Sequence, residues 1–310
     1  MLSRRTLLSS SLAATAALAA ENVLSEKVSA QSAKRSIVDA QVHLWKAESE
    51  DWKWVPGLKP QMPEPFTIEK LVPLMDEAGV DRVVVVPPSW PGDRNDYALE
   101  AVKRYPGRFA VMGRIPLKDP KSAALLPAWR DTPGMLGIRV TFLGPTTTWL
   151  SDGTADWFWP AAEKAGLPVM FLTEGRPATI ASVAERYPQL QLIADHMGIG
   201  GTTVREGRVA DAVSQAASLA KYPNVSVKLS AAPNYSAEAY PFRDFTPHIK
   251  RLFEAFGPQR CHWGSDMTNG FDKATYPQRI THFTQELPFL TEADKDLIMG
   301  KSILAKLRWS

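Results

Sequence analysis

The chain has 310 residues, of which 45% are hydrophobic and 22% are charged, and its formal net charge is +3. This composition is that of an ordinary globular protein, and the length suits one large domain or two small ones. So small a positive excess does not indicate a nucleic-acid-binding protein. The single cysteine, Cys261, excludes an intrachain disulfide. Because it falls in an apolar run, we expect a buried and inert thiol.

Residues 1–30 form a separate segment. The sequence Ser-Arg-Arg-Thr-Leu-Leu at positions 3–8 begins a mildly apolar stretch that ends near Ala20, and this pattern resembles a twin-arginine export signal. The stretch is short for a permanent membrane-spanning helix. Cleavage after Ala20 or Ala30 would leave a periplasmic protein, carried across the membrane in folded form by the twin-arginine translocation machinery. An uncleaved anchor or a disordered leader is the alternative.

Eight short apolar runs, rich in β-branched residues, follow along the rest of the chain. They are continuous rather than alternating, which is typical of parallel strands that are covered on both faces. Helical patterns separate them, and several of these end at Tyr-Pro. We expect strands at 36–44, 81–87, 109–115, 136–142, 168–172, 190–196, 224–229 and 260–266. We expect helices at 68–78, 96–105, 120–129, 157–165, 178–187, 208–221, 245–256 and within 278–307.

Eight strands that alternate with eight helical segments predict an α/β fold, a single-domain (β/α)8 TIM barrel over residues 31–310. A doubly wound open sheet is the alternative. The first strand is not followed by Gly-x-Gly-x-x-Gly, which that fold would favour. The glycine-rich segment 198–201 follows the sixth strand and lacks this spacing, so we expect it to be a flexible loop at the rim.

Polar and charged side chains fall at or near the carboxyl ends of the expected strands. They are His43, Arg114, Arg139, Thr173, Glu174, His196, Lys228 and Asp266. The carboxyl ends of barrel strands meet at one rim, so these residues are expected to lie together. Five basic or imidazole side chains gathered at one rim with only two carboxylates would be costly without a ligand or mutual pairing. The pattern therefore predicts a site for an acidic small molecule.

Each of these residues also has a structural explanation. His43 and His196 could bond to loop carbonyls, and Asp266 could cap the turn that follows it. Arg139 could pair with Glu174, and Lys228 could extend along the surface. Each explanation is reasonable for a single residue. Chance does not favour all of them together, because it would scatter such groups over both ends of the barrel. The three other histidines are expected to take no part: His262 faces the helices, and His248 and His282 lie at the surface.

Five segments resemble motifs of the amidohydrolase superfamily, in its amidohydrolase-related branch of lactonases and decarboxylases. They are Val-Asp-Ala-Gln-Val-His (38–43), Gly-Ile-Arg (137–139), Ala-Asp-His-Met-Gly (194–198), Val-Lys-Leu-Ser (227–230) and Trp-Gly-Ser-Asp (263–266). By the order of these motifs, the resemblance covers residues 36–308. The third and fifth segments are most similar to pyrone-dicarboxylate lactonase and its sugar-lactone and muconolactone-type relatives.

The resemblance implies roles for four residues. Asp266 takes the place of the family's general base, His43 and His196 lie beside the reacting carbonyl, and Arg139 holds a substrate carboxylate. One departure concerns the first strand, where the family has two histidines and this chain has Gln41 in the first position. An amide is a poorer zinc ligand than imidazole, which disfavours a two-metal site. Gln41 can instead donate its amide hydrogens to a substrate oxygen.

The leading hypothesis is hydrolysis of a small lactone that carries a carboxylate or sulfonate, such as an intermediate of aromatic-compound breakdown. Asp266 would take a proton from the attacking water. His43 and His196, with help from Gln41 and Lys228, would stabilise the developing oxyanion. Arginine side chains would hold the acidic substituent by paired hydrogen bonds. The candidates are Arg139 first, then Arg114 and Arg176.

Two alternatives are left open. In the first, His43, His196 and Asp266 bind one zinc or manganese ion in a mononuclear metal-dependent amidohydrolase or decarboxylase. In the second, the chain is a periplasmic binding protein for anionic small molecules that kept the barrel and lost the chemistry. All three readings expect a small anionic ligand, no nucleic acid and no stable membrane insertion. A homo-oligomer is compatible with each of them.

Overall fold

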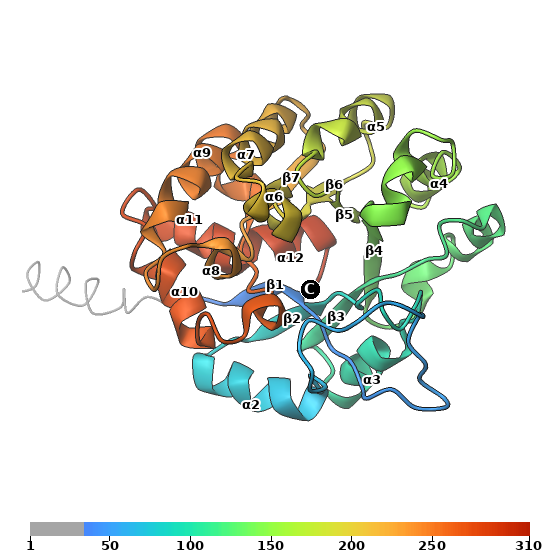
Figure 1. The fold of residues 1–310 in the computed structure, drawn as a ribbon, viewed down its shortest axis with the longest axis horizontal. Helices are drawn as coiled ribbons and strands as arrows, with labels where there is room; N and C mark the ends of the chain where they lie inside the picture. Colours follow the sequence, from blue (N-terminus) through green and yellow to red (C-terminus); the bar gives the residue numbers. More distant parts are fainter. Residues whose placement is uncertain (1–33) are drawn as a thin grey trace, which may run out of the picture. The chain divides into compact units, whose positions relative to one another are not determined.

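Eight parallel strands form the centre of the fold (Figure 1). The computed structural model describes residues 34–310, and the expected export signal lies outside the described residues, so it stays a prediction. Each strand pairs in parallel with the next one along the chain. The strands are β1 (Val38–Val42), β2 (Arg82–Val85), β3 (Phe109–Gly113), β4 (Met135–Thr141), β5 (Val169–Leu172), β6 (Leu192–Ala194), β7 (Val225–Lys228) and β8 (Cys261–His262). The predicted barrel is confirmed.

The ring closes between the last strand and the first, although β8 has only two residues. The amide of Ala40 donates to the Trp263 carbonyl at 3.2 Å, and the amide of Asp266 donates to the Gln41 carbonyl at 2.9 Å. A Cβ atom at Gly264 would lie 3.1 Å from both the Cβ and the amide nitrogen of Gln41. Glycine therefore allows the chain after β8 to approach β1 closely. This contact places Asp266 beside the end of the first strand.

Helices cover the outside of the strand ring (Figure 1). The α-helices are α2 (Ile68–Ala78), α3 (Asp96–Arg104), α4 (Phe158–Lys164), α5 (Ala181–Arg186), α6 (Gly201–Arg205), α7 (Val209–Ser218), α8 (Ala232–Tyr235), α9 (Thr246–Phe256), α10 (Tyr276–Thr284), α11 (Glu292–Asp296) and α12 (Ser302–Leu307). Among the described residues, none of the helices has the length and apolar character needed to cross a membrane.

Three expected segments differ from the structure. Residues 120–129 do not form one continuous helix. They contain the 3-10 turn η1 (Pro120–Leu125) and the start of η2 (Trp129–Asp131), because Pro127 between them lacks the amide donor that a continuous helix needs. The region 278–307 is divided into α10, α11 and α12, and a proline, Pro288, lies between the first two. The segment 198–201 is not a simple loop, because a 3-10 turn ends at Gly198 and α6 begins at Gly201.

His282, expected at the surface, is instead buried. Its ring packs edge-on against Phe242 and Phe283, with centroid distances of 5.4 and 5.3 Å. Burial in these apolar surroundings lowers the pKa of His282 to about 4. His262 faces α12 and Cys261 is buried, and both agree with the expectation from the sequence.

Apolar residues plug one end of the barrel and leave the other to polar groups. Inside the ring, buried residues of five strands form one apolar cluster with Ile303 and Leu307 of α12. Gly300, just before α12, lies so close to β1 that an added Cβ would be 2.6 Å from the carbonyl oxygen of Ser36. Because Ser36 precedes β1, α12 closes the amino-terminal end of the strands. The carboxyl-terminal end is where the predicted site residues lie.

Asp39 ties β1 to the segment after β8. Its Oδ1 accepts hydrogen bonds from the amides of Gln41 (2.9 Å) and Ser265 (2.8 Å), and its Oδ2 accepts one from the Tyr276 hydroxyl (2.7 Å). All of these groups lie in the interior, so each donor would be left unpaired if the carboxylate were removed.

We expect Asp39→Ala to lower the free energy of unfolding by about 3 kcal/mol or more, since three buried donors lose their acceptor at roughly 1–3 kcal/mol each. Tyr276→Phe removes one donor and its bond, and should cost only about 1 kcal/mol. Urea unfolding followed by circular dichroism measures both. An Asp39→Ala variant as stable as the wild type would show that this carboxylate does not hold the barrel closed.

Candidate active site

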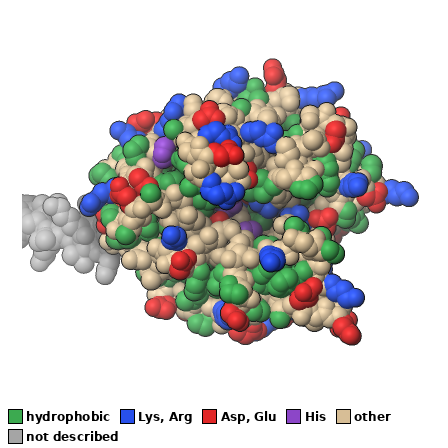
Figure 2. Space-filling view, viewed as in Figure 1, with side chains coloured by type: hydrophobic (Ala, Val, Ile, Leu, Met, Phe, Trp, Pro, Cys, Tyr) green, Lys and Arg blue, Asp and Glu red, His purple; other side chains and the backbone are tan. Residues whose placement is uncertain are grey.

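A cavity of about 480 Å³ lies at the carboxyl-terminal end of the strands. This volume is within the range of roughly 300–1,000 Å³ that small-molecule sites occupy. The space-filling view shows a hollow near the middle of the face, with histidine at its floor and Lys or Arg side chains beside it (Figure 2). Its wall includes His43 at the end of β1, Arg139 on β4 and His196 after β6. Three residues predicted from the sequence therefore meet in one cavity.

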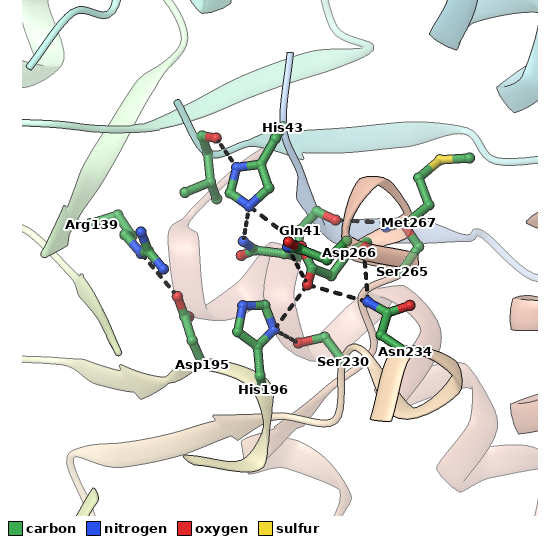
Figure 3. A network of polar contacts seen from close by, with 12 residues as sticks. Gln41, His43, Arg139, Asp195, His196, Ser230, Asn234, Ser265, Asp266 and Met267 are labelled. Carbon is green, nitrogen blue, oxygen red and sulfur yellow. Dashed lines mark hydrogen bonds and ion pairs between the residues drawn. The ribbon is translucent and has the colours of Figure 1, made fainter. Parts of the chain in front are cut away.

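The carboxylate of Asp266 lies directly beneath this cavity and is fully buried. The side-chain amide of Asn269 donates to both carboxylate oxygens at 2.9 Å, and that of Asn234 lies 3.4 Å from Oδ2. Two histidines flank the same carboxylate (Figure 3). His43 Nε2 is 3.4 Å from Oδ1, and His196 Nδ1 is 3.8 Å from Oδ2. All four surrounding side chains also line the cavity, so they form its floor.

Asp266 is ionised in this setting. Burial alone would raise the pKa of its carboxyl group, but the neighbouring His196 and His43 and the hydrogen bond from Asn269 outweigh burial and lower the pKa to about 2. The two histidine–carboxylate distances are long for direct hydrogen bonds. Such spacing suits groups that share a water molecule or a ligand atom placed between them.

Hydrogen bonding fixes the proton of His43. Its Nδ1 lies 2.6 Å from the carbonyl oxygen of Val86, which can only accept, so Nδ1 carries the hydrogen. In the neutral ring, Nε2 is then an acceptor, and the side-chain amide nitrogen of Gln41 lies 3.2 Å away. The Gln41 oxygen must point the other way, because it accepts a hydrogen bond from the ammonium of Lys228. Lys228 thus sets the orientation of Gln41, and Gln41 sets that of His43.

Lys228 belongs to a buried group of alternating charges. Its ammonium forms an ion pair with Asp195 Oδ1 at 2.7 Å. Asp195 Oδ2 accepts a hydrogen bond from Arg139 Nε at 3.2 Å (Figure 3). Burial would raise the pKa of Asp195, but the two cations outweigh it and lower that pKa. Burial also lowers the pKa of Lys228, and Asp195 offsets part of this effect. One carboxylate therefore serves two cations.

The backbone is strained where the site residues lie. His196, Met197 and Asp266 all have positive φ angles, of 50°, 59° and 47°. L-residues adopt this region rarely, and such strain is concentrated at functional sites in proteins. His196 also contacts the Ser230 hydroxyl through Nδ1 at 2.9 Å, and burial lowers the pKa of its imidazole. The left-handed turns aim the side chains of His196 and Asp266 toward each other.

Four predicted substrate-binding residues lie away from the histidine-lined cavity. Gln41 and Lys228 are fully buried beneath it and are bonded to each other. Arg176 is exposed and lines neither this cavity nor its neighbour. Arg114 lines the neighbouring cavity, where its Nε donates to Asp93 at 3.2 Å. Burial and the charge of Arg139 lower the pKa of Arg114 to about 10, so it stays cationic.

Sequence reasoning missed the two asparagines that hold Asp266. Asn269 lies three residues after Asp266 in the turn that follows it, and this short spacing was a usable signal. Asn234 comes from α8, and no pattern in the sequence connects that helix with β8. Arg279 of α10 keeps Asn234 in place, with Nη1 2.9 Å from its side-chain oxygen.

The donor set does not fit a metal ion. Within residues 34–310, no group of three or more His, Cys, Asp or Glu side chains is arranged to hold one. The oxygen of Gln41, which replaces the expected first histidine, faces the ammonium of Lys228. A second cation beside that ammonium would be repelled. We therefore derive no step of the chemistry through a metal.

Known proteins resemble this chain in sequence. The L-fucono-1,5-lactonase of Burkholderia ambifaria is 29% identical over 238 residues, which cover 74% of this chain and 79% of the relative. The 4-sulfomuconolactone hydrolase of Hydrogenophaga intermedia is 29% identical over 213 residues, which cover 66% of each protein.

The fold and the family agree with these likenesses. A crystal structure of an amidohydrolase from Burkholderia multivorans with bound zinc superposes with a TM-score of 0.75, at 20% identity, and covers 89% of this chain and 100% of that one. This shows that the barrel fold is shared. A family model described as amidohydrolase matches residues 38–303. Because that match covers most of the chain, the protein belongs to the amidohydrolase family.

Proposed function

We propose that the protein hydrolyses a small lactone that carries a negative charge. One observation carries the proposal: an ionised, buried carboxylate, Asp266, lies under a cavity whose wall presents the guanidinium of Arg139. The first group suits activation of water, and the second suits binding of an anion. Two relatives with 29% identity are named as lactone hydrolases, and one of their names specifies a sulfonated lactone. The names thus support both the reaction and the charge of the substrate.

Asp266 would activate the water. Oδ1 of the ionised carboxylate lies at the cavity floor, 3.4 Å from His43 Nε2, and can accept a hydrogen bond from one water molecule. Asp266 takes a proton from this water as its oxygen attacks the lactone carbonyl carbon. The ring C–O bond then breaks, and the proton held by Asp266 passes to the departing ring oxygen. The product is a hydroxy acid, and Asp266 is again ionised.

His196 would stabilise the oxyanion that forms during this attack. If the Ser230 hydroxyl donates to Nδ1, the neutral ring carries its hydrogen on Nε2 and can donate it to the developing charge. A well-placed donor of this kind contributes about 3–4 kcal/mol to the transition state. The lowered pKa of His196 keeps the ring neutral near pH 7, so this tautomer is available.

Gln41 and Lys228 act as positioning residues in this proposal. Both lie below the cavity, and the ammonium donates to the Gln41 oxygen. The Gln41 amide nitrogen then faces His43 Nε2. They hold the first-strand histidine in its orientation beside Asp266.

Arg139 would bind the acidic substituent. Within the described residues, its guanidinium donates a hydrogen bond from Nε to Asp195. The hydrogens of both Nη atoms are left for a ligand. A substrate carboxylate beside these Nη atoms would gain charge-assisted hydrogen bonds.

Asp266→Asn should lower kcat for hydrolysis of a carboxylated lactone by roughly 100- to 10,000-fold, because the amide cannot accept the proton. Ring opening is followed by absorbance, with zinc and manganese added and omitted. Asp211→Asn is the matched control. Asp211 is exposed on α7, and its carboxylate accepts a hydrogen bond from the side chain of Gln215. Near-normal hydrolysis by Asp266→Asn would refute the assignment of the base.

Arg139→Gln should raise KM for a carboxylated lactone by roughly 10- to 100-fold, because it removes charge-assisted hydrogen bonds. For an uncharged lactone with the same ring, the change should stay within about threefold, since no such bonds are lost. Asp195 keeps its ion pair with Lys228, so the fold is retained. Arg176→Gln, at an exposed position, is the control for loss of an arginine. Equal losses on both lactones would mean that Arg139 serves the structure and not the anion.

A further inference from the structure

A second cavity, of about 660 Å³, adjoins the first. It lies beside the loops that follow β1 to β4, and the two cavities share Ser89, Arg139, Thr141 and Leu143 in their walls. They therefore meet at Arg139. The first cavity alone is large enough for a small lactone, so the second offers room that such a ring does not need.

The wall of the second cavity is largely hydrocarbon. It includes Val55 and Leu58 from the long loop after β1, Leu117 from the loop after β3, and Leu143 and Trp149 from the segment after β4. Val55 and Leu58 are 40% and 44% exposed, and they are two of the four large hydrophobic residues that the described chain exposes. Apolar side chains gathered in a concave, exposed wall favour binding of an apolar group.

The charged groups of this cavity are Asp93, Arg114 and Arg139. Arg114 pairs there with Asp93 through Nε, and its buried Nη1 has no hydrogen-bond partner within the described residues. Arg139 lies at the junction with the first cavity. A carboxylate at this junction would meet the Nη atoms of Arg139. Hydrocarbon surface leads away from it toward Leu58.

We propose that the second cavity is a subsite for a hydrocarbon arm of the substrate, attached beside its carboxylate. The inference rests on the proposed function, because it takes the carboxylate at Arg139 as its anchor. The lactone ring then lies over Asp266 in the first cavity, and the arm extends past Leu143 into the second. The substrate class becomes anionic lactones with an alkyl or aryl substituent.

Binding of butanoate, hexanoate and octanoate, measured by calorimetry, tests the subsite without any lactone ring. Each added methylene should lower Kd about fourfold, the equivalent of about 0.8 kcal/mol, until the arm fills the cavity. Leu58→Ser should make Kd less dependent on chain length, because Leu58 lines only this cavity. Leu125→Ser is the matched control, since Leu125 is 52% exposed on η1 and outside both cavities.

Affinity that does not change with chain length would overturn the subsite, as would the same chain-length dependence in Leu58→Ser and Leu125→Ser. Hydrolysis of a short carboxylated lactone is measured on the same preparations. In one outcome the protein does not hydrolyse the lactone and still binds longer carboxylates more tightly, with Leu58→Ser weakening that trend. This result would reject the proposed function and keep the apolar subsite. Hydrolysis with no chain-length dependence would keep the function and reject the subsite.

Discussion

The arrangement of the site depends on how one buried ammonium group is neutralised. Lys228 is fully buried, and removing an ammonium group from water costs several kcal/mol unless it is paired and hydrogen-bonded. Asp195 supplies the opposite charge, and the oxygen of Gln41 accepts a further bond. Because an ammonium group can only donate hydrogen bonds, it must face the oxygen of the Gln41 amide. The nitrogen of that amide therefore faces His43. Asp195 also holds Arg139 at the cavity wall. One ion pair thus orients both His43, which lies beside the proposed base, and Arg139, the proposed anion-binding residue.

The barrel and much of its rim could be predicted from the sequence, because both depend on local patterns. Continuous apolar runs mark buried parallel strands, and the carboxyl ends of such strands must share one rim. His43, His196 and Asp266 were predicted in this way. In the structure, each of the two histidines lies within 4 Å of the Asp266 carboxylate. Arg139 follows from the same rule. The resemblance of short motifs to the amidohydrolases agrees with the family that the chain belongs to.

The remainder depends on contacts between distant segments, which strand patterns do not encode. Lys228 ends β7, and nothing in its local sequence shows that it points inward to Gln41 instead of outward to solvent. Arg176 follows β5 closely and yet is exposed, because the turn after that strand directs it away. Asn234 reaches Asp266 from α8, a helix too short to leave a periodic signal. His282 was misplaced because the helix pattern did not show that a second apolar layer covers it.

The central claim of the proposal is that Asp266 acts directly on water, without a metal ion. Lys228 helps to organise the site in which it does so. The most direct measurement compares hydrolysis of a carboxylated lactone with the metal content of the same samples, before and after treatment with a chelator and after zinc is restored. The account predicts an unchanged rate per enzyme molecule when the metal content falls far below one ion per chain. A rate that falls in proportion to the metal content and returns with zinc would contradict it.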